Sequence, residues 1–135
     1  MRDRLVRPKL LVVDDEKVIA DTLVMIFLQH GYDARAVYSA EQALEAIVDW
    51  RPAVAIVDII LPQMNGIELA NVLRAQEPSM EVLLITGQIV GDLLAERLDQ
   101  AGHRFDVLMK PVQVPALIEN TERLLANFDH LRRGN

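Results

Sequence analysis

The stretch Leu10-Leu11-Val12-Val13-Asp14-Asp15 is a short apolar run that ends in two acidic residues. The same pattern returns in Val54-Ala55-Ile56-Val57-Asp58 and, with a basic end, in Val107-Leu108-Met109-Lys110-Pro111. Such runs are typical of strands buried on both faces of a parallel sheet. The carboxyl ends of these strands share one edge, where ligands bind. The sequence therefore predicts one small acidic pocket with a single lysine, suited to a metal ion and a phosphoryl group.

Bulk composition is that of one globular domain. The chain has 135 residues, of which 51% are hydrophobic and 25% are charged, so it is long enough to bury a core and is not of disordered composition. No apolar stretch reaches the roughly 18 residues that span a bilayer, and the N-terminus does not resemble a signal peptide. The absence of cysteine excludes disulfides and thiolate metal sites. We expect a cytoplasmic protein without membrane contact.

Charge is unevenly distributed along the chain. The net charge is −6, yet residues 1–9 and the Arg132-Arg133 pair are basic, so the body between them is more acidic than the whole. An acidic body argues against direct nucleic-acid binding, which needs a basic patch. We therefore expect a basic N-terminal tail at residues 1–8, one domain at residues 9–129 and a short C-terminal tail at residues 130–135.

Strand and helix patterns alternate regularly through this domain. The expected strands cover residues 10–13, 32–37, 53–57, 82–85 and 106–109, and the helices that follow them include residues 19–27, 43–48, 67–74, 93–98 and 117–128. A βα repeat of this kind predicts an α/β fold, a doubly wound, open parallel sheet with helices on both faces.

Three sequence signals place the helix ends. Ser39 with Gln42 three residues later forms a capping box, and Asn65 with Glu68 is a second candidate. Gly31 is expected to stop the first helix after His30.

The acidic residues have two possible explanations. Asp14 and Asp15 could cap the following helix, since aspartate is favoured beside the positive end of its dipole. One residue would suffice for that, and two with Glu16 next to them crowd like charges that a hard divalent cation would neutralise. Asp58 could be a turn residue. As a carboxylate at the end of an apolar strand beside such a cation, it is also a candidate nucleophile toward phosphorus.

The opposite side of the expected pocket carries a cation and a hydroxyl. Lys110 precedes a proline, which favours an extended backbone and keeps the lysine out of the next helix. Thr86 ends the fourth strand and offers a hydroxyl to a phosphate oxygen, and Gly87 leaves room for the backbone to approach. Each residue alone has an ordinary explanation as a surface or strand-end residue.

Taken together, these motifs resemble the receiver domain of two-component response regulators. The resemblance rests on Val13-Asp14-Asp15-Glu16, on Asp58 through Gly66, on Thr86-Gly87 and on Lys110-Pro111, in the order and spacing of that family, and extends over about residues 9–128. It implies a flavodoxin-like, CheY-like fold with five parallel strands in the order 2-1-3-4-5.

The resemblance also implies roles for individual residues. Asp58 corresponds to the phosphoacceptor. Asp15, Asp58 and the backbone carbonyl of Ile60 correspond to direct ligands of Mg²⁺, and Asp14 corresponds to a residue that acts through water.

On the phosphoryl side, Lys110 corresponds to the lysine that pairs with the phosphoryl group, and Thr86 to the threonine that moves to hydrogen-bond it. The Lys110-Pro111 peptide bond is expected to be cis.

Two positions depart from the family's pattern. Val107 occupies a position that usually holds a tyrosine or phenylalanine whose rotamer responds to the threonine. Phe105 lies two residues earlier and, by strand alternation, on the same face. We expect the switch to operate without the usual aromatic side chain. Ile60 and Gln88 border the water that attacks the phosphorylated aspartate, and we expect a bulky Ile60 to slow the loss of phosphate.

The leading hypothesis is a phosphorylation-controlled signalling module. Asp58 would receive a phosphoryl group from a sensor histidine kinase or a phosphotransfer protein, with Mg²⁺, and an unidentified downstream protein would respond to the change. The domain would catalyse only its own phosphorylation and dephosphorylation, so we do not expect it to be an enzyme with an external substrate. The alternative is a phosphorylation-insensitive receiver that binds its partner constitutively.

A third class, an aspartate-nucleophile phosphatase or a flavin protein, lacks support in the sequence. The Asp-x-Asp pattern of the first and the Ser/Thr/Gly-rich phosphate loop of the second are both absent after the first strand. We expect a monomer or weak homodimer, either complete or part of a longer protein.

Overall fold

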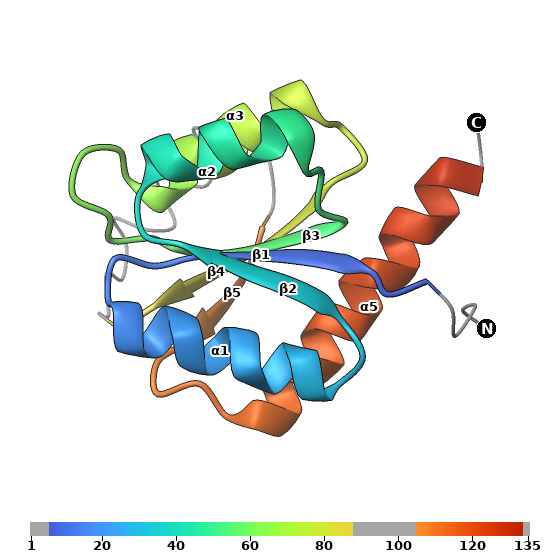
Figure 1. The fold of residues 1–135 in the computed structure, drawn as a ribbon, viewed down its shortest axis with the longest axis horizontal. Coiled ribbons are helices and arrows are strands. Elements are labelled where there is room, and N and C mark those ends of the chain that lie inside the picture. Colours follow the sequence, from blue (N-terminus) through green and yellow to red (C-terminus); the bar gives the residue numbers. More distant parts are fainter. Residues whose placement is uncertain (1–5, 88–104, 134–135) are drawn as a thin grey trace.

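A computed structural model describes residues 6–87 and 105–133 of the chain. Five parallel strands form one sheet in the order β2-β1-β3-β4-β5, which confirms the predicted fold class and strand order (Figure 1). The strands are β1 (Lys9–Val13), β2 (Asp33–Val37), β3 (Val54–Asp58), β4 (Glu81–Thr86) and β5 (Asp106–Met109).

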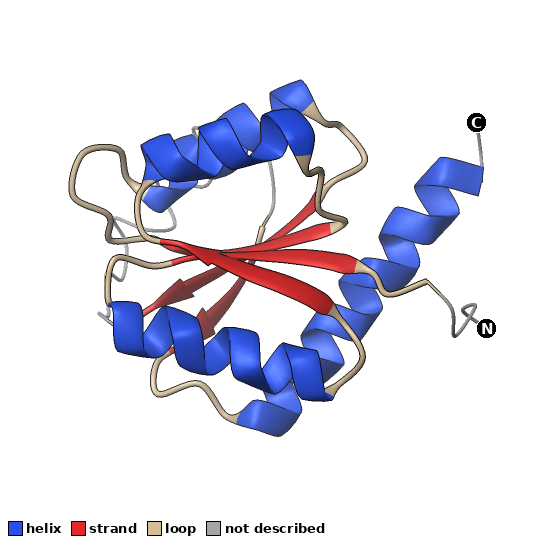
Figure 2. Cartoon of the chain, viewed as in Figure 1, coloured by secondary structure: helices blue, strands red, loops and turns tan. Residues whose placement is uncertain are grey.

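Helices cover both faces of this sheet, as Figure 2 shows. One face carries α2 (Ala40–Asp49) and α3 (Gly66–Gln76), and the other carries α1 (Lys17–Gln29) and α5 (Val114–Arg133). The helix predicted around residues 93–98 lies outside the described residues, as does Gln88. No described helix is long and apolar enough to cross a membrane.

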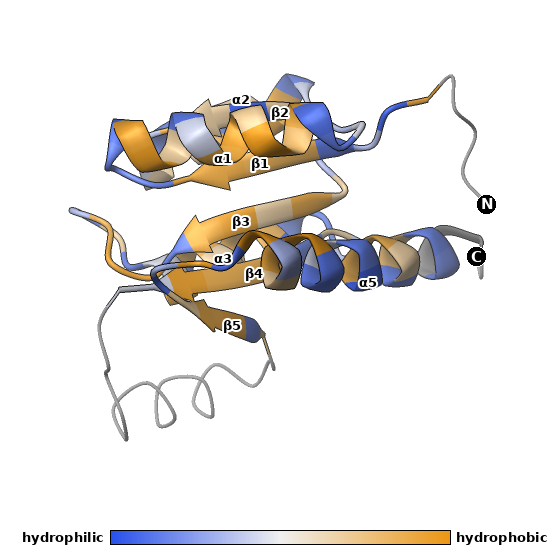
Figure 3. Cartoon of the chain, turned by 90° about the horizontal axis from the view of Figure 1, so that it is seen from below, coloured by the Kyte–Doolittle hydropathy of each residue, from blue (hydrophilic) through white to orange (hydrophobic). Residues whose placement is uncertain are grey.

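The strands bury both of their faces because alternate side chains enter two separate cores. On the α2/α3 side, Leu11, Val57 and Leu84 belong to one cluster, whereas Leu10, Ile56 and Leu83 belong to the cluster under α1 and α5. The central strands are therefore mostly hydrophobic, with polar residues such as Asp58 and Glu81 at their ends, and the helices mix apolar and polar residues (Figure 3). Each fully buried Leu or Ile contributes about 1.5–3 kcal/mol relative to exposure.

Local capping agrees with the sequence prediction and refines it. The Ser39 side chain accepts a hydrogen bond from the Gln42 N–H, and the Gln42 side chain accepts from Tyr38, one residue before the usual partner in a capping box. Asn65 caps α3, because its Oδ1 accepts from the Glu68 N–H, and its side-chain amide donates in return to Glu68 Oε1. The first helix ends at Gln29, and Gly31 has a φ of 89°, a left-handed conformation that glycine adopts without strain.

Strand register decides which side chains meet at the carboxyl edge of the sheet. Val13 lies beside Val57, Asp58 beside Ile85, and Thr86 beside Met109. The residues that end or follow β1, β3, β4 and β5 are therefore neighbours, although nearly 100 positions separate Asp14 from Lys110. The fold thus builds the acidic edge that the sequence predicts.

Candidate functional site

Lys110 joins the two acidic strand ends. Its Nζ lies 3.0 Å from Asp14 Oδ2 and 2.9 Å from Asp58 Oδ2. Both carboxylates are almost fully buried, with 0% of Asp14 and 4% of Asp58 exposed. Two buried like charges at this separation need a cation between them. The lysine supplies that cation.

The second oxygen of each carboxylate accepts a backbone hydrogen bond. Asp14 Oδ1 accepts from the Glu16 N–H at 2.9 Å, and Asp58 Oδ1 accepts from the Ile60 N–H at 2.9 Å. Aspartate commonly bonds the backbone two residues ahead in this way. The turn after each strand therefore orients its carboxylate toward Lys110.

The end of β4 ties the two neighbouring loops together. The Lys110 N–H donates to the carbonyl oxygen of Thr86 at 2.8 Å, and the Ile59 N–H donates to that of Ile85 at 2.8 Å. Thr86 is fully buried. The Lys110-Pro111 peptide bond is cis, as expected. Thr86 thus lies beside the backbone of the lysine, close to the carboxylates that the lysine contacts.

Gly66 controls how closely α3 approaches the phosphoacceptor candidate. A Cβ at this position would lie 2.2 Å from the backbone oxygen of Asp58, a distance that side-chain carbons do not tolerate. The Gly66 N–H also donates to the carbonyl oxygen of Ile59 at 2.8 Å. This role of Gly66 was not predicted from the sequence, although the Asn65-Gly66 pair at a helix start was the available signal.

Burial and hydrogen bonding shift the pKa values of both Asp58 and Lys110 upward. Burial raises the pKa of the Asp58 carboxyl and the charge of Asp14 adds to this, whereas the hydrogen bonds from Lys110 and Ile60 oppose it. Burial lowers the pKa of Lys110, but its hydrogen bonds to Asp58 and Asp14 outweigh burial and leave that pKa raised. Negative charge at this edge of the sheet is therefore unfavourable, and binding of a further cation there would stabilise it.

A possible metal-binding group lies at the same place. One carboxylate oxygen from each of Asp14, Glu16 and Asp58 falls within 4.8 Å of the others, a donor set that suits a hard divalent cation. Glu16 is exposed, and Lys110 Nζ is 3.7 Å from its Oε1. Asp15 is also exposed and does not belong to this group. Its expected role as a direct ligand therefore stays a prediction.

The remaining predicted residues flank this group. Ile60 is 46% exposed, and its N–H donates to Asp58 Oδ1. The expected role of its carbonyl oxygen as a metal ligand stays a prediction. Val107 is half-buried and Phe105 is buried, and both pack in the core under α2 and α3, which confirms that they share a face. Val107 pairs with Leu84 and Met109 with Thr86, so Phe105, one residue before β5, lies at the end of the strand pair away from Thr86. Phe105 is therefore poorly placed to replace the missing aromatic.

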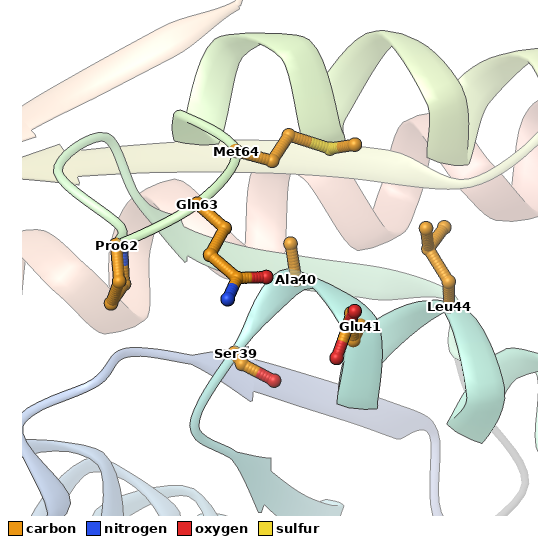
Figure 4. A pocket seen from close by; sticks show the side chains of 7 residues that line it. All are labelled: Ser39, Ala40, Glu41, Leu44, Pro62, Gln63 and Met64. Carbon is orange, nitrogen blue, oxygen red and sulfur yellow. The ribbon is translucent and has the colours of Figure 1, made fainter.

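A separate cavity lies beside the loop that follows Asp58. It has a volume of about 360 Å³ and is bounded by the first turns of α2 and by Pro62, Gln63 and Met64 (Figure 4). Neither Asp14 nor Asp58 lines it. The cavity is thus separate from the acidic site.

Comparison with known proteins decides the family. A family model described as the response regulator receiver domain matches residues 10–122. The chain belongs to this family. As a receiver domain it is similar to the DNA-binding response regulator MtrA of Mycolicibacterium smegmatis, with 32% identity over 91% of this chain and 53% of that protein, and to MtrA of Mycobacterium tuberculosis, with 30% identity over the same shares. The receiver domain spans about half the length of these curated relatives.

Solved receiver domains have the same fold. A CheY-like receiver domain from Methanospirillum hungatei matches with a TM-score of 0.84 and 27% identity, over 93% of this chain and 98% of that one. The receiver domain of an HD domain-containing protein from Pseudomonas fluorescens matches with a TM-score of 0.87 and 27% identity, over 98% and 96%. The chain is therefore the receiver domain of a two-component response regulator.

Proposed function

We propose that this receiver domain accepts a phosphoryl group on Asp58 from a sensor histidine kinase or a phosphotransfer protein, in the presence of Mg²⁺. The contact of Lys110 Nζ with both Asp14 and Asp58 supports this most strongly. It places an oxygen nucleophile beside a fixed cation at the edge where such sheets bind ligands.

The transfer itself needs positioning more than covalent machinery. An Asp58 oxygen forms a bond to phosphorus while the bond from phosphorus to the donor's imidazole nitrogen breaks. The Ile60 N–H orients the carboxylate, and Lys110 neutralises charge on the phosphoryl oxygens. Asp15, Asp58 and the Ile60 carbonyl are the proposed direct metal ligands, and Asp14 would hold the metal through water. Mg²⁺, when bound, supplies further positive charge at the phosphoryl oxygens.

The product would be a switched signalling protein rather than an enzyme with an external substrate. Thr86 is proposed to hydrogen-bond the phosphoryl group and so to stabilise one of two conformations that a downstream protein distinguishes. We propose that this domain acts in the cytoplasm as a monomer or weak homodimer and does not contact nucleic acid itself, because its charge is acidic between the basic ends.

Intact mass after incubation with acetyl phosphate tests the phosphorylation. We expect one added phosphoryl group in the wild type with Mg²⁺, less with a chelator, and none in Asp58→Asn. An unchanged mass in the wild type, or modification of the Asp58→Asn variant, would refute the proposal.

The second candidate is a receiver that binds its partner regardless of phosphorylation. Val107, in place of the usual aromatic side chain, is the observation that favours it. Backbone amide spectra before and after phosphorylation separate the two. Changes confined to the neighbours of Asp58 would favour the constitutive module, whereas changes that reach β5 and α5 would favour the switch.

A further inference from the structure

The loop between β3 and α3 ends in a chemically labile dipeptide, Asn65-Gly66. Asparagine is among the thermally labile residues. When glycine follows, the backbone nitrogen of the glycine meets no side-chain obstacle as it approaches the asparagine side-chain carbonyl. Deamidation through a cyclic imide is therefore intrinsically favoured at this peptide bond.

The fold engages both reacting groups in hydrogen bonds. Asn65 Oδ1 accepts from the Glu68 N–H at 2.9 Å, and Asn65 Nδ2 donates to Glu68 Oε1 at 2.8 Å. The attacking nitrogen is occupied as well, because the Gly66 N–H donates to the carbonyl oxygen of Ile59 at 2.8 Å. Ring closure requires these contacts to break.

The surroundings of the loop favour local rather than global opening. Pro62 and Gln63 are exposed, and the cavity of about 360 Å³ separates this part of the loop from the first turns of α2 (Figure 4). Within this loop Leu61 and Met64 pack in the core under α2 and α3, whereas Pro62 and Gln63 do not belong to that cluster. Opening confined to residues 62–66 therefore breaks the apolar contacts of Met64 and leaves those of Leu61, and segments of this size open without unfolding of the whole domain.

We propose that Asn65 is a spontaneous deamidation site that the folded β3–α3 loop keeps closed and that local opening of this loop exposes. In the open loop, the Gly66 nitrogen gives up its proton and bonds to Asn65 Cγ, and the bond from Cγ to the side-chain nitrogen breaks. That nitrogen leaves as ammonia. Water then opens the imide to aspartate or isoaspartate, without oxidation or reduction.

The two products have different consequences for Asp58. Aspartate keeps a carboxylate oxygen that caps α3 as Asn65 does. Isoaspartate adds a methylene to the main chain immediately before Gly66, and Gly66 lies against the Asp58 backbone so closely that a Cβ on it would meet the Asp58 carbonyl oxygen at 2.2 Å. The isoaspartate form should therefore displace the loop that holds the acidic site.

Peptide mapping by mass spectrometry measures the rate directly. The full chain is incubated in mildly alkaline buffer, either native or unfolded in guanidinium chloride, and the peptide containing residues 65–66 is followed. We expect deamidation at least about tenfold slower in the native chain, since the loop is mostly closed. Equal rates in the two conditions would overturn the proposal.

Three variants distinguish local opening from global unfolding. Glu68→Ala removes the acceptor of the Asn65 amide and should speed native deamidation severalfold, whereas Glu68→Gln keeps an acceptor oxygen and should not. Gln42→Ala removes a bond to the Tyr38 N–H at the start of α2 and serves as the matched control. Acceleration by Gln42→Ala as large as by Glu68→Ala would overturn the local route. No phosphodonor is involved, so the result is independent of the proposed function.

Discussion

At the scale of single residues, the site depends on one positive charge. Lys110 lets two carboxylates, both almost fully buried, lie on either side of its ammonium group. Asp14 and Asp58 could be expected from the sequence because each ends an apolar strand. The bridge between them could not, because it depends on side-chain directions that only the packed loops define.

Removing this charge should destabilise the domain. Lys110→Ala leaves two buried carboxylates without their shared partner, and we expect it to lower the free energy of unfolding by about 3 kcal/mol at neutral pH. Divalent cations should restore stability in the variant more than in the wild type. Urea unfolding with and without Mg²⁺ measures both effects. Lys9→Ala, at an exposed position, is the control, and a loss as large in that control would contradict the explanation.

The exposed side chain of Ile60 should set the lifetime of the phosphorylated form. Its bulk beside Asp58 is expected to hinder alignment of the attacking water, so phosphate should be lost over many minutes or longer. Ile60→Ala should lose phosphate about tenfold faster, a barrier change of about 1.4 kcal/mol. Phosphate release from purified phosphorylated protein measures the rate. Val48→Ala, also exposed but on α2, should not change it, and wild-type loss within seconds would disprove the idea.

At the scale of elements, the β3–α3 connection carries more of the site than its sequence reveals. The cap of α3 by Asn65 with Glu68 was predictable because it depends on residues three positions apart. The contact of Gly66 with the Asp58 backbone was not, because it depends on the angle at which α3 leaves the loop. The predicted helix near residues 93–98 lies outside the described chain.

Gly66→Ala tests this element. The new methyl carbon would meet the Asp58 backbone oxygen at 2.2 Å, so either the loop or the helix must shift. We expect a loss of about 3 kcal/mol in the free energy of unfolding, as for severe overpacking, together with slower phosphorylation of Asp58. Thermal unfolding and intact mass after acetyl phosphate treatment are the measurements.

Gly87→Ala is the matched control for that variant. Its methyl carbon would lie 3.5 Å from Lys110 Cδ, an ordinary contact. We expect near wild-type stability, and equal losses in the two variants would argue against a specific role for Gly66.

At the scale of the whole molecule, the pH dependence of stability follows from carboxyl groups outside the site. Burial raises the pKa of the Glu81 carboxyl at the start of β4; Arg74 opposes this and Asp106 adds to it. A carboxyl whose pKa is higher in the folded than in the unfolded chain binds protons more readily when folded. Its charged form therefore destabilises the fold at neutral pH, and this cost disappears as the pH falls through the folded-state pKa.

Glu81→Gln should therefore raise the melting temperature at pH 7, with a gain that vanishes in acid. Glu77 is the matched comparison, because its pKa shifts in the opposite direction. The Ser79 hydroxyl lowers the pKa of Glu77 against the effect of burial, and Arg51 adds to the lowering. Glu77→Gln should lower the melting temperature at neutral pH, and that loss should shrink as the pH falls through the folded-state pKa. Thermal unfolding from pH 3 to 8 checks both signs, and equal signs would contradict the assignment.

The sequence by itself determined the parallel sheet, its strand ends and the acidic and basic residues at its carboxyl edge. These follow from apolar periodicity and chain connectivity, which are local properties. Only the tertiary structure decided that a carboxylate oxygen of Glu16 lies within 4.8 Å of oxygens of Asp14 and Asp58, and that Lys110 contacts both buried acids. The physical reason is that a one-residue change of register or turn reverses a side chain's direction, and packing between distant elements selects the register.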